Sequence, residues 1–307
     1  MNQRLDIYKI MKRFFLVLAL VATVACNRAS ELRSQVNMEN AYHFNTYLST
    51  LEIPSKMDFC GERIPLEIPE VKERVEREFY LLLQQPGQVI LYLKRSGRYF
   101  PMFEKAAKDL GLPDDLKYLA VAESALYMSR SSKSAVGLWQ FMEATAKAIG
   151  LVVNDYVDER RNPEKSTYCG LKYLQQGYNK HKSWICAAAG YNMGHGGVSE
   201  NLNFQGAKDY FELFLNEETS RYIFRIVCIK EIMSNPAKYG FKLRSDQYYQ
   251  PDKVKTVKVE TAIPNLANWA KQQGTTYKDV KLLNRWILKR ELPAPAKGAS
   301  YQIAIPQ

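Results

Sequence analysis

Residues 113–127 read PDDLKYLAVAESALY and predict a helix that carries a carboxylate on its apolar face. Leu116, Leu119 and Glu123 lie at i, i+3 and i+7, so Glu123 shares the face that packs into the core. Burial raises the pKa of a carboxyl group, which suits a general acid working near neutral pH. Taken alone, Glu123 fits a structural glutamate bonded to backbone or to an arginine better. The sequence around it therefore has to decide its role.

The composition is that of a globular protein with a basic surface. The chain has 307 residues, of which 46% are hydrophobic and 24% charged, enough for one sizeable domain and a smaller module. The formal net charge is +11, and about +3 of it falls in the first 25 residues. The remaining surplus favours an anionic partner, such as nucleic acid, an acidic lipid surface or a cell-wall polymer with carboxylates.

The N-terminal residues predict export. Lys12 and Arg13 precede the apolar run FFLVLALVATVA, which ends at Cys26. Residues 1–25 are therefore predicted to be a lipoprotein signal peptide and Cys26 the lipidated residue, although Thr23 stands where the bacterial motif usually has Leu. Ordinary cleavage or a retained anchor is the alternative. We expect an anchored chain in the bacterial envelope facing the periplasm, at the outer rather than the inner membrane because Asn27 follows the cysteine, with no nucleic-acid partner.

The other four cysteines, Cys60, Cys169, Cys186 and Cys228, leave two alternatives open. An oxidising periplasm permits disulfides between them, but buried free thiols on helices fit at least as well. There is no Cys-x-x-Cys motif and no nearby pair of histidines. The sequence therefore predicts neither a metal site nor a cofactor.

The chain is predicted to be mainly α-helical, with a small βααβ module at its end. Residues 26–68 are polar and then interrupted by prolines, as expected of a tether. Residues 69–240 show helical spacing without useful strand-like alternation, and helices are expected up to Tyr127 and from Leu138 to Ile149 among others. In residues 241–307, KTVKVE and SYQIAIP alternate like strands around the helical stretches NLANWAKQQG and TYKDVKLLNRWIL.

Four short blocks follow one another in the helical segment. They are Glu123-Ser124, Gly137-Leu138-Trp139-Gln140, Gly190-Tyr191-Asn192, and Glu218-Thr219 with Tyr222. In this order they resemble the lytic transglycosylase domain of glycoside hydrolase family 23, the relatives of goose-type lysozyme. The resemblance implies a lysozyme-like all-α catalytic domain over residues 69–240, and the arrangement is similar to that of membrane-bound members of the family.

The resemblance also implies a role for each matched residue. Glu123 corresponds to the catalytic acid and base. Ser131, or its neighbour Ser132, corresponds to a serine that positions the N-acetyl group of the substrate, and Gln140 to a residue of the glycan groove. Ser124 is expected at the same site.

The last two blocks complete the implied site. Tyr191 and Asn192 correspond to a pair beside the reacting sugar, and Tyr222 to a tyrosine near the acid. Gly190 departs from the family pattern, which usually has Ala there, and Gly197 stands where Arg is frequent.

The implied substrate is peptidoglycan, and the implied reaction is cleavage of the β-1,4 bond between N-acetylmuramic acid and N-acetylglucosamine without water, leaving 1,6-anhydro ends. Glycosidases ordinarily use two carboxylates. The first three blocks hold no second one, Glu218 is predicted to begin a helix, and the other nearby acids are expected to be caps or loop charges: Glu143, Asp155, Asp158 and Glu159. Two alternatives remain, a goose-type hydrolase and a wall-binding scaffold without catalysis.

Residues 241–307 resemble a LysM module, which binds glycans that contain N-acetylglucosamine. Glu260-Thr261-Ala262 replaces the usual Gly-Asp-Thr turn, so the module is expected to be degenerate, either glycan-binding or a structural cap. Trp139 is expected to pack in the core rather than stack on a sugar. The histidines, His43, His181 and His195, are expected at the surface or at caps because no serine or cysteine motif matches them.

Overall fold

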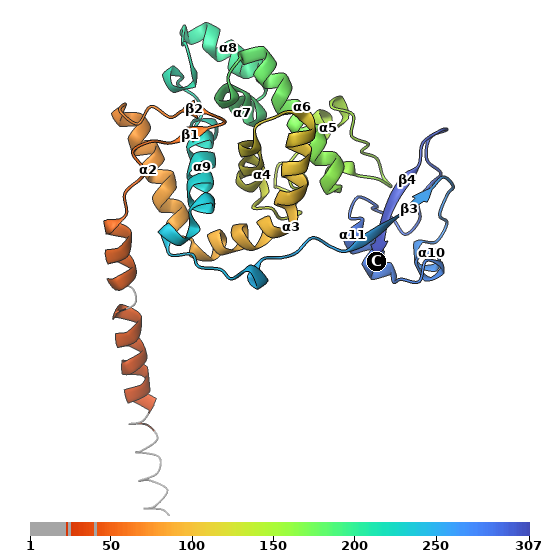
Figure 1. Ribbon diagram of the computed structural model, residues 1–307, viewed down its shortest axis with the longest axis horizontal. Coiled ribbons are helices and arrows are strands. Elements are labelled where there is room, and N and C mark those ends of the chain that lie inside the picture. The colour runs from red at the N-terminus through yellow and green to blue at the C-terminus, as the bar shows by residue number, and fades with distance from the viewer. Residues whose placement is uncertain (1–22, 24–25, 40–41) are drawn as a thin grey trace, which may run out of the picture. The chain divides into compact units, whose positions relative to one another are not determined.

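The computed structural model describes Thr23, residues 26–39 and residues 42–307 (Figure 1). Apart from Thr23, the predicted signal peptide lies outside the described residues. The chain divides into two compact units, Met1–Glu52 and Ile53–Gln307. In the first unit, residues 26–39 and 42–50 are helical, and Cys26 is exposed with a free thiol. Among the described residues, no helix combines the length and the apolar character that a membrane span requires.

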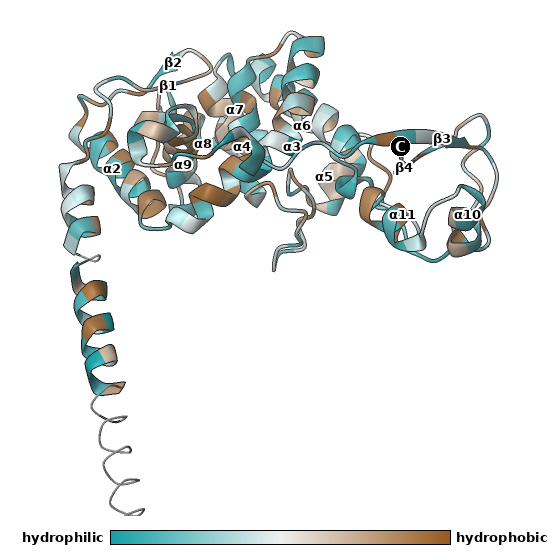
Figure 2. Ribbon diagram, turned by 60° about the horizontal axis from the view of Figure 1, so that its bottom comes forward, coloured by the Kyte–Doolittle hydropathy of each residue, from teal (hydrophilic) through white to brown (hydrophobic). Residues whose placement is uncertain are grey.

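The second unit begins with a helical body. Its helices pack around α7, whose residues from Trp184 to Gly190 are all buried. Helices α6, α8 and α9 contact α7, and α2 and α4 contact α9. Figure 2 shows both hydrophobic and hydrophilic stretches on these helices, as expected where one face is buried.

The helices of the body have the following bounds: α2 Pro69–Leu83, α3 Pro86–Leu110, α4 Lys117–Ser124, α5 Glu143–Ala148, α6 Pro163–His181, α7 Trp184–Met193, α8 His195–Gln205 and α9 Glu217–Ser234. Short 3-10 turns lie at Asp114–Leu116, Glu159–Arg161, Tyr210–Glu212, Pro236–Tyr239 and Ser245–Gln247.

Two of these helices are shorter than the sequence predicts. Helix α4 ends at Ser124 because Ala125 and Leu126 adopt left-handed backbone angles, with φ of 56° and 55°. The helix expected from Leu138 begins only at Glu143. The preceding residues form a loop with short antiparallel bridges, Arg130 to Val136 and Val136 to Phe141.

Residues 53–68, within the predicted tether and entry segment, belong to the second unit. They form a small hairpin of β1 (Asp58–Phe59) and β2 (Glu62–Arg63), with Phe59 and Ile64 buried. The Glu62 carboxylate accepts hydrogen bonds from Ser183 Oγ, at 2.6 Å, and from the first backbone N–H groups of α7. An anion at a helix N-terminus satisfies donors that the helix itself cannot.

The C-terminal module has the predicted βααβ order, and the mainly α fold class is confirmed. Strands β3 (Val254–Val259) and β4 (Tyr301–Pro306) pair antiparallel, with Val254 opposite Pro306, and enclose α10 (Leu266–Gln272) and α11 (Tyr277–Leu283).

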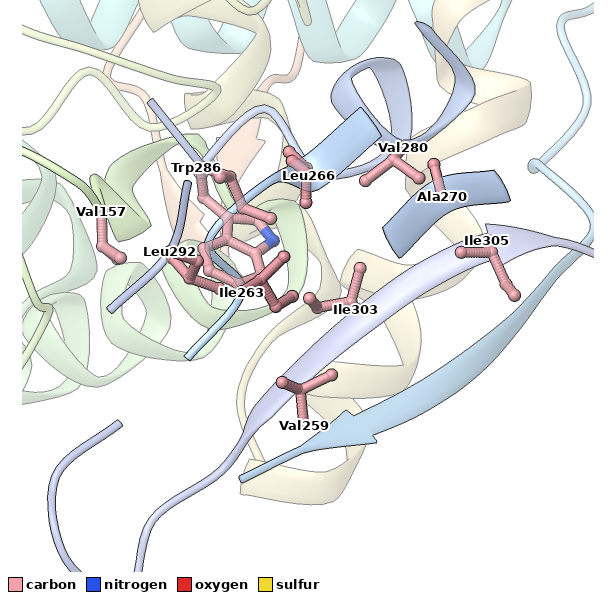
Figure 3. Close-up of a cluster of buried hydrophobic side chains, with 11 residues drawn as sticks. Val157, Val259, Ile263, Leu266, Ala270, Val280, Trp286, Leu292, Ile303 and Ile305 are labelled. Atoms are coloured by element: carbon pink, nitrogen blue, oxygen red, sulfur yellow. The ribbon is translucent and has the colours of Figure 1, made fainter. Parts of the chain in front are cut away.

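The core of this module includes one residue from the helical body. Val157, 2% exposed, belongs to the same buried cluster as Trp286 and Leu292 (Figure 3). The flanking backbone also bonds to the module, since Asp158 N–H donates to Trp286 O and Leu288 N–H to Tyr156 O. The 152–160 loop therefore ties the module to the body.

The described cysteines all have free thiols, so none of the disulfides that the sequence leaves open is formed among them. Cys186 and Cys228 are buried, and Cys60 and Cys169 are partly buried. Burial raises the pKa of each of these four thiols.

Candidate active site

Glu123 lies in the last turn of α4 and faces a cleft of about 560 Å3. Left-handed Ala125 stops the helix two residues later, so the acid is held on a rigid turn beside a loop. The cleft brings together six of the seven residues that the sequence predicts for the site: Glu123, Ser131, Gln140, Tyr191, Asn192 and Tyr222.

Ser124 is the predicted site residue that does not line the cleft. It is buried, and its hydroxyl donates to the carbonyl oxygens of Ala120, at 3.1 Å, and Leu138, at 2.8 Å. The second bond ties α4 to the loop that carries Gln140. Ser124 thus has a structural role, connecting α4 to this loop without lining the cleft.

Burial raises the pKa of Glu123 to about 7, and the nearby carboxylate of Glu218 adds to the rise. Two groups oppose this effect, because the Tyr222 hydroxyl donates to Glu123 Oε1 and the Arg225 guanidinium carries a positive charge. A carboxyl group with this pKa holds and releases a proton with similar ease near neutral pH. That is the property that a residue acting first as acid and then as base requires.

Tyr222 is buried and Tyr191 is partly buried, and both phenols are neutral. Burial raises the pKa of both hydroxyls well above the usual value, and the Glu123 charge adds to the rise. Tyr191 lines the cleft, and its hydroxyl donates to Trp139 O at 2.6 Å. Trp139 itself is fully buried, and its Nε1–H donates to Thr167 Oγ1 at 3.0 Å, in agreement with the predicted core role.

Asn192 is oriented by the start of helix α9. Its Nδ2 donates to Glu218 Oε1 at 3.3 Å, and its Oδ1 accepts from Thr219 Oγ1 at 2.8 Å. Asn216 is the N-cap of α9 and accepts from Thr219 N–H at 3.0 Å. The amide that faces the cleft therefore depends on a helix cap.

Gln140 has a left-handed backbone, with φ of 49°, which costs free energy for a residue with a Cβ and is common at functional sites. Its side chain donates to Gly137 O at 2.7 Å. Gly137 has φ of 90°, and a Cβ there would lie 2.0 Å from the Arg160 carbonyl oxygen, so only glycine fits. Ser131 and Ser132 both line the cleft, and Ser131 Oγ accepts from Ala135 N–H at 3.0 Å.

The cleft also contains charged residues that sequence reasoning did not assign to it. Glu218, expected only to begin a helix, lines the cleft with its carboxylate 3.1 Å from Lys133 Nζ, and this ion pair lowers its pKa. Arg225 lies three residues after Tyr222, on the same face of α9, and its Nε is 3.5 Å from buried Glu78. The i, i+3 spacing from Tyr222 is the signal that could have revealed Arg225.

The other acids considered from the sequence do not line the cleft. Glu143 pairs with Lys147 at 2.6 Å, and Glu159 pairs with Lys165. Asp158 caps a 3-10 turn and pairs with Arg160 at 2.8 Å. Asp158 is thus a cap, as expected, whereas Glu159 is buried rather than a solvated loop charge, because the 152–160 loop packs against the module.

His195, expected at the surface or at a cap, lies at the start of a helix but not at the surface. It begins α8 partly buried, with its ring 4.4 Å from the Tyr173 ring and its Nε2 3.1 Å from Tyr173 O. Burial lowers its pKa, which favours the neutral form. A Cβ added at Gly190 would lie 2.1 Å from His195 Nδ1. The imidazole therefore fills the space that an alanine methyl would need at Gly190, immediately before Tyr191.

No group of three or more His, Cys, Asp or Glu residues in the described part of the chain could hold a metal ion. The cleft contains one carboxyl group of raised pKa, two neutral phenols, amides and the Lys133–Glu218 ion pair.

Two family models match the chain. Residues 100–214 match the transglycosylase SLT domain, and residues 255–307 match the soluble lytic transglycosylase C-terminal LysM-like domain. The first match covers most of the cleft but stops short of α9, which supplies Tyr222.

Similar curated proteins include the membrane-bound lytic murein transglycosylase D of Escherichia coli K12, 27% identical over 192 residues, or 60% of this chain and 42% of that protein. The peptidoglycan transglycosylase gp16 of Escherichia phage T7 is 38% identical over 102 residues, or 32% of this chain and 8% of the phage protein. The chain thus spans less than half the length of these relatives. Among solved structures, an inactive mutant of the lytic transglycosylase Slt from Pseudomonas aeruginosa matches with a TM-score of 0.37 and 22% identity, over 50% of this chain and 26% of that one.

Proposed function

We propose that this chain, which carries a transglycosylase SLT domain and a LysM-like domain, is a peptidoglycan lytic transglycosylase. Its substrate would be the glycan strand of the cell wall, cleaved between N-acetylmuramic acid and N-acetylglucosamine. The relatives described above are named for murein or peptidoglycan. The observation that carries the proposal is Glu123, a carboxyl group with a pKa of about 7 facing a cleft lined by phenols and amides.

The proposed reaction uses Glu123 twice. Protonated Glu123 donates to the glycosidic oxygen, and the bond from that oxygen to C1 of N-acetylmuramic acid breaks. The oxygen of the 2-acetamido group stabilises C1 from the opposite face. The Glu123 carboxylate then accepts the proton of the sugar's own 6-hydroxyl as that oxygen bonds to C1, which restores the acid and forms the 1,6-anhydro ring.

The remaining cleft residues supply orientation. Tyr222 holds Glu123 through its hydroxyl, and Asn192 is fixed by Thr219 and Glu218. Ser131 and Gln140 offer polar groups from a loop with little freedom. Fixing a sugar ring and its acetamide in the reactive geometry lowers the entropic part of the barrier.

Goose-type hydrolysis is a second candidate because Glu218 lines the same cleft. A hydrolase needs a carboxylate that activates water. The Lys133 ion pair lowers the pKa of Glu218, and a carboxylate of low pKa is a weak base. This electrostatic setting favours the reaction without water over hydrolysis.

The proposal places the chain in the bacterial cell envelope, facing the periplasm. The relative from Escherichia coli is named as membrane-bound. Lipidation of the exposed Cys26 would supply the anchor, and the outer membrane is proposed over the inner one because Asn27 follows.

Mass spectrometry of muropeptides tests the proposed reaction. The chain from Cys26 onward is incubated with purified peptidoglycan, and the released products are analysed. Products ending in 1,6-anhydro-N-acetylmuramic acid, lighter than reducing ends by one water, are expected. Reducing ends would instead establish a hydrolase, and the absence of any product would favour a wall-binding scaffold.

Replacing Glu123 by Gln tests the assignment of the acid. The amide cannot donate or accept the proton, so product formation should fall by about 10³-fold or more. The folded state should be at least as stable, since a buried ionisable group is removed. Thermal unfolding and product yield are compared with those of Glu143→Gln, a change at an exposed acid outside the cleft. Substantial turnover by Glu123→Gln would overturn the assignment.

A further inference from the structure

A second cavity of about 590 Å3 adjoins the Glu123 cleft. Met193 and Glu217 line it, and each is a chain neighbour of a cleft residue, Asn192 or Glu218. Thr219 links the two linings, because its hydroxyl donates to Asn192 Oδ1 of the cleft and its N–H donates to Asn216 Oδ1 of the second cavity. A polymer bound in the cleft and leaving it past residues 192–194 would therefore pass over the second cavity.

Phe214 lines this second cavity and is 85% exposed. Its neighbours Leu213 and Leu215 are 6% and 9% exposed. The backbone is extended at Leu213, and Leu215 also contributes to the lining of this cavity. The two leucines anchor the segment in the core and leave the aromatic ring in solvent.

The backbone of Phe214 is held by one side chain. Its N–H donates to Gln205 Oε1 at 2.7 Å, and its carbonyl accepts from Gln205 Nε2 at 3.0 Å. An isolated exposed apolar residue needs no explanation. Here, however, both the N–H and the carbonyl group of Phe214 are hydrogen-bonded. The backbone that carries the exposed ring is therefore held in place.

Arg74 lines the second cavity together with Phe214 and supplies hydrogen-bond donors there. Its Nη1 donates to Ser220 O at 3.4 Å, and its Nε pairs with Glu70. A guanidinium group has five N–H donors, so others remain for hydroxyl, acetamide or carboxylate oxygens. An aromatic face with hydrogen-bond donors beside it suits a sugar ring, whose faces are apolar and whose edges are polar.

We propose that this cavity is an additional glycan subsite, in which Phe214 stacks against a sugar of the strand that extends beyond the catalytic cleft. The inference rests on the proposed function and makes it more specific, because it gives the enzyme a preference for long strands over short fragments.

The test measures binding of glycan strands sorted by length to the full chain carrying Glu123→Gln, which prevents turnover. Phe214→Ala should weaken binding of long strands about five- to tenfold, with a smaller loss as the strands shorten. Phe204→Ala is the matched control, because Phe204 is 88% exposed on α8 and does not line this cavity. Phe214→Trp should retain binding, and neither alanine variant should change thermal stability much.

Equal binding by Phe214→Ala and Phe204→Ala at every strand length would overturn the subsite. So would an equal loss in Phe214→Trp, since a larger aromatic face should still stack. The proposed function is judged separately, by the products of the unsubstituted chain. A chain that forms no anhydro ends but loses strand binding in Phe214→Ala would keep the subsite and lose the proposed reaction.

Discussion

The proton affinity of Glu123 results from opposing contacts of a single side chain. Burial and Glu218 disfavour the carboxylate, whereas the Tyr222 hydroxyl and Arg225 favour it, and the balance is a pKa of about 7. The phenol is thus a means of setting the pH range of the acid, in addition to orienting it.

Replacing Tyr222 by Phe should therefore shift the pH dependence of activity. The Tyr222 hydroxyl donates to the ionised form of Glu123 and lowers its pKa, so its loss raises that pKa. Proton donation requires protonated Glu123, and activity is lost as pH rises through the pKa. The alkaline limb of the kcat/KM profile should move to higher pH, together with a lower maximal rate. An unmoved limb would mean that Tyr222 does not act on this titration.

Substitutions at Gly190 and His195 should have coupled effects on the free energy of unfolding. Gly190→Ala brings a methyl group against the imidazole and should destabilise the fold by about 1–3 kcal/mol. His195→Ala makes room for that methyl group, so the double variant should lose less than the two single changes add up to. Denaturant unfolding of the four proteins measures this. Gly196→Ala, where an added Cβ meets nothing within 4 Å, is the control. Strict additivity would argue against the steric account.

At the scale of elements, the cap of α9 connects local stability to the site. Asn216→Ala should cost about 1 kcal/mol of unfolding free energy, as for other N-caps. Thr219 loses its bond to Asn216 in this variant, and Thr219 in turn orients Asn192 in the cleft. Turnover of a short soluble substrate should therefore fall several-fold. Asn162→Ala removes the equivalent cap of α6, outside the cleft, and should cost similar stability without the loss of turnover. Equal turnover in the two variants would contradict this coupling.

The sequence predicts those elements best whose apolar positions recur on one face. Helices α2, α6 and α9 and the βααβ order of the module follow from such spacing. Residues 138–141 are apolar at helical spacing and yet form a loop, because Gly137 and Gln140 take left-handed angles and Arg160 donates to Phe141 O at 3.2 Å. Helix α8 escapes prediction, since HGGVSENLNFQ contains two glycines and has only Val198 buried.

The site was predicted where a motif carries it. Six predicted residues meet in one cleft, whereas Glu78, Lys133, Arg225 and the place of Glu218 in the cleft were not foreseen. Glu78 is on α2 and holds Arg225 on α9, so its role depends on how two helices distant in sequence pack. Spacing along one helix cannot reveal a partner on another.

At the scale of the whole molecule, Val157 joins the helical body to the module. We expect the two to unfold together in the unsubstituted chain. Val157→Asp buries a charge in the module core and should separate the calorimetric transition into two, with the module melting first. Val152→Asp, at a position 47% exposed in the same loop, should leave one transition. A single unshifted transition in Val157→Asp would show that this contact does not couple them.

The free thiols bear on how the protein matures. The thiolate is the form of cysteine that oxidises readily, and burial raises the pKa of Cys60, Cys169, Cys186 and Cys228. For a chain exported as proposed, these side chains resist the oxidising surroundings once folding has enclosed them. Retention of these thiols in air is thus expected to depend on the protein remaining folded.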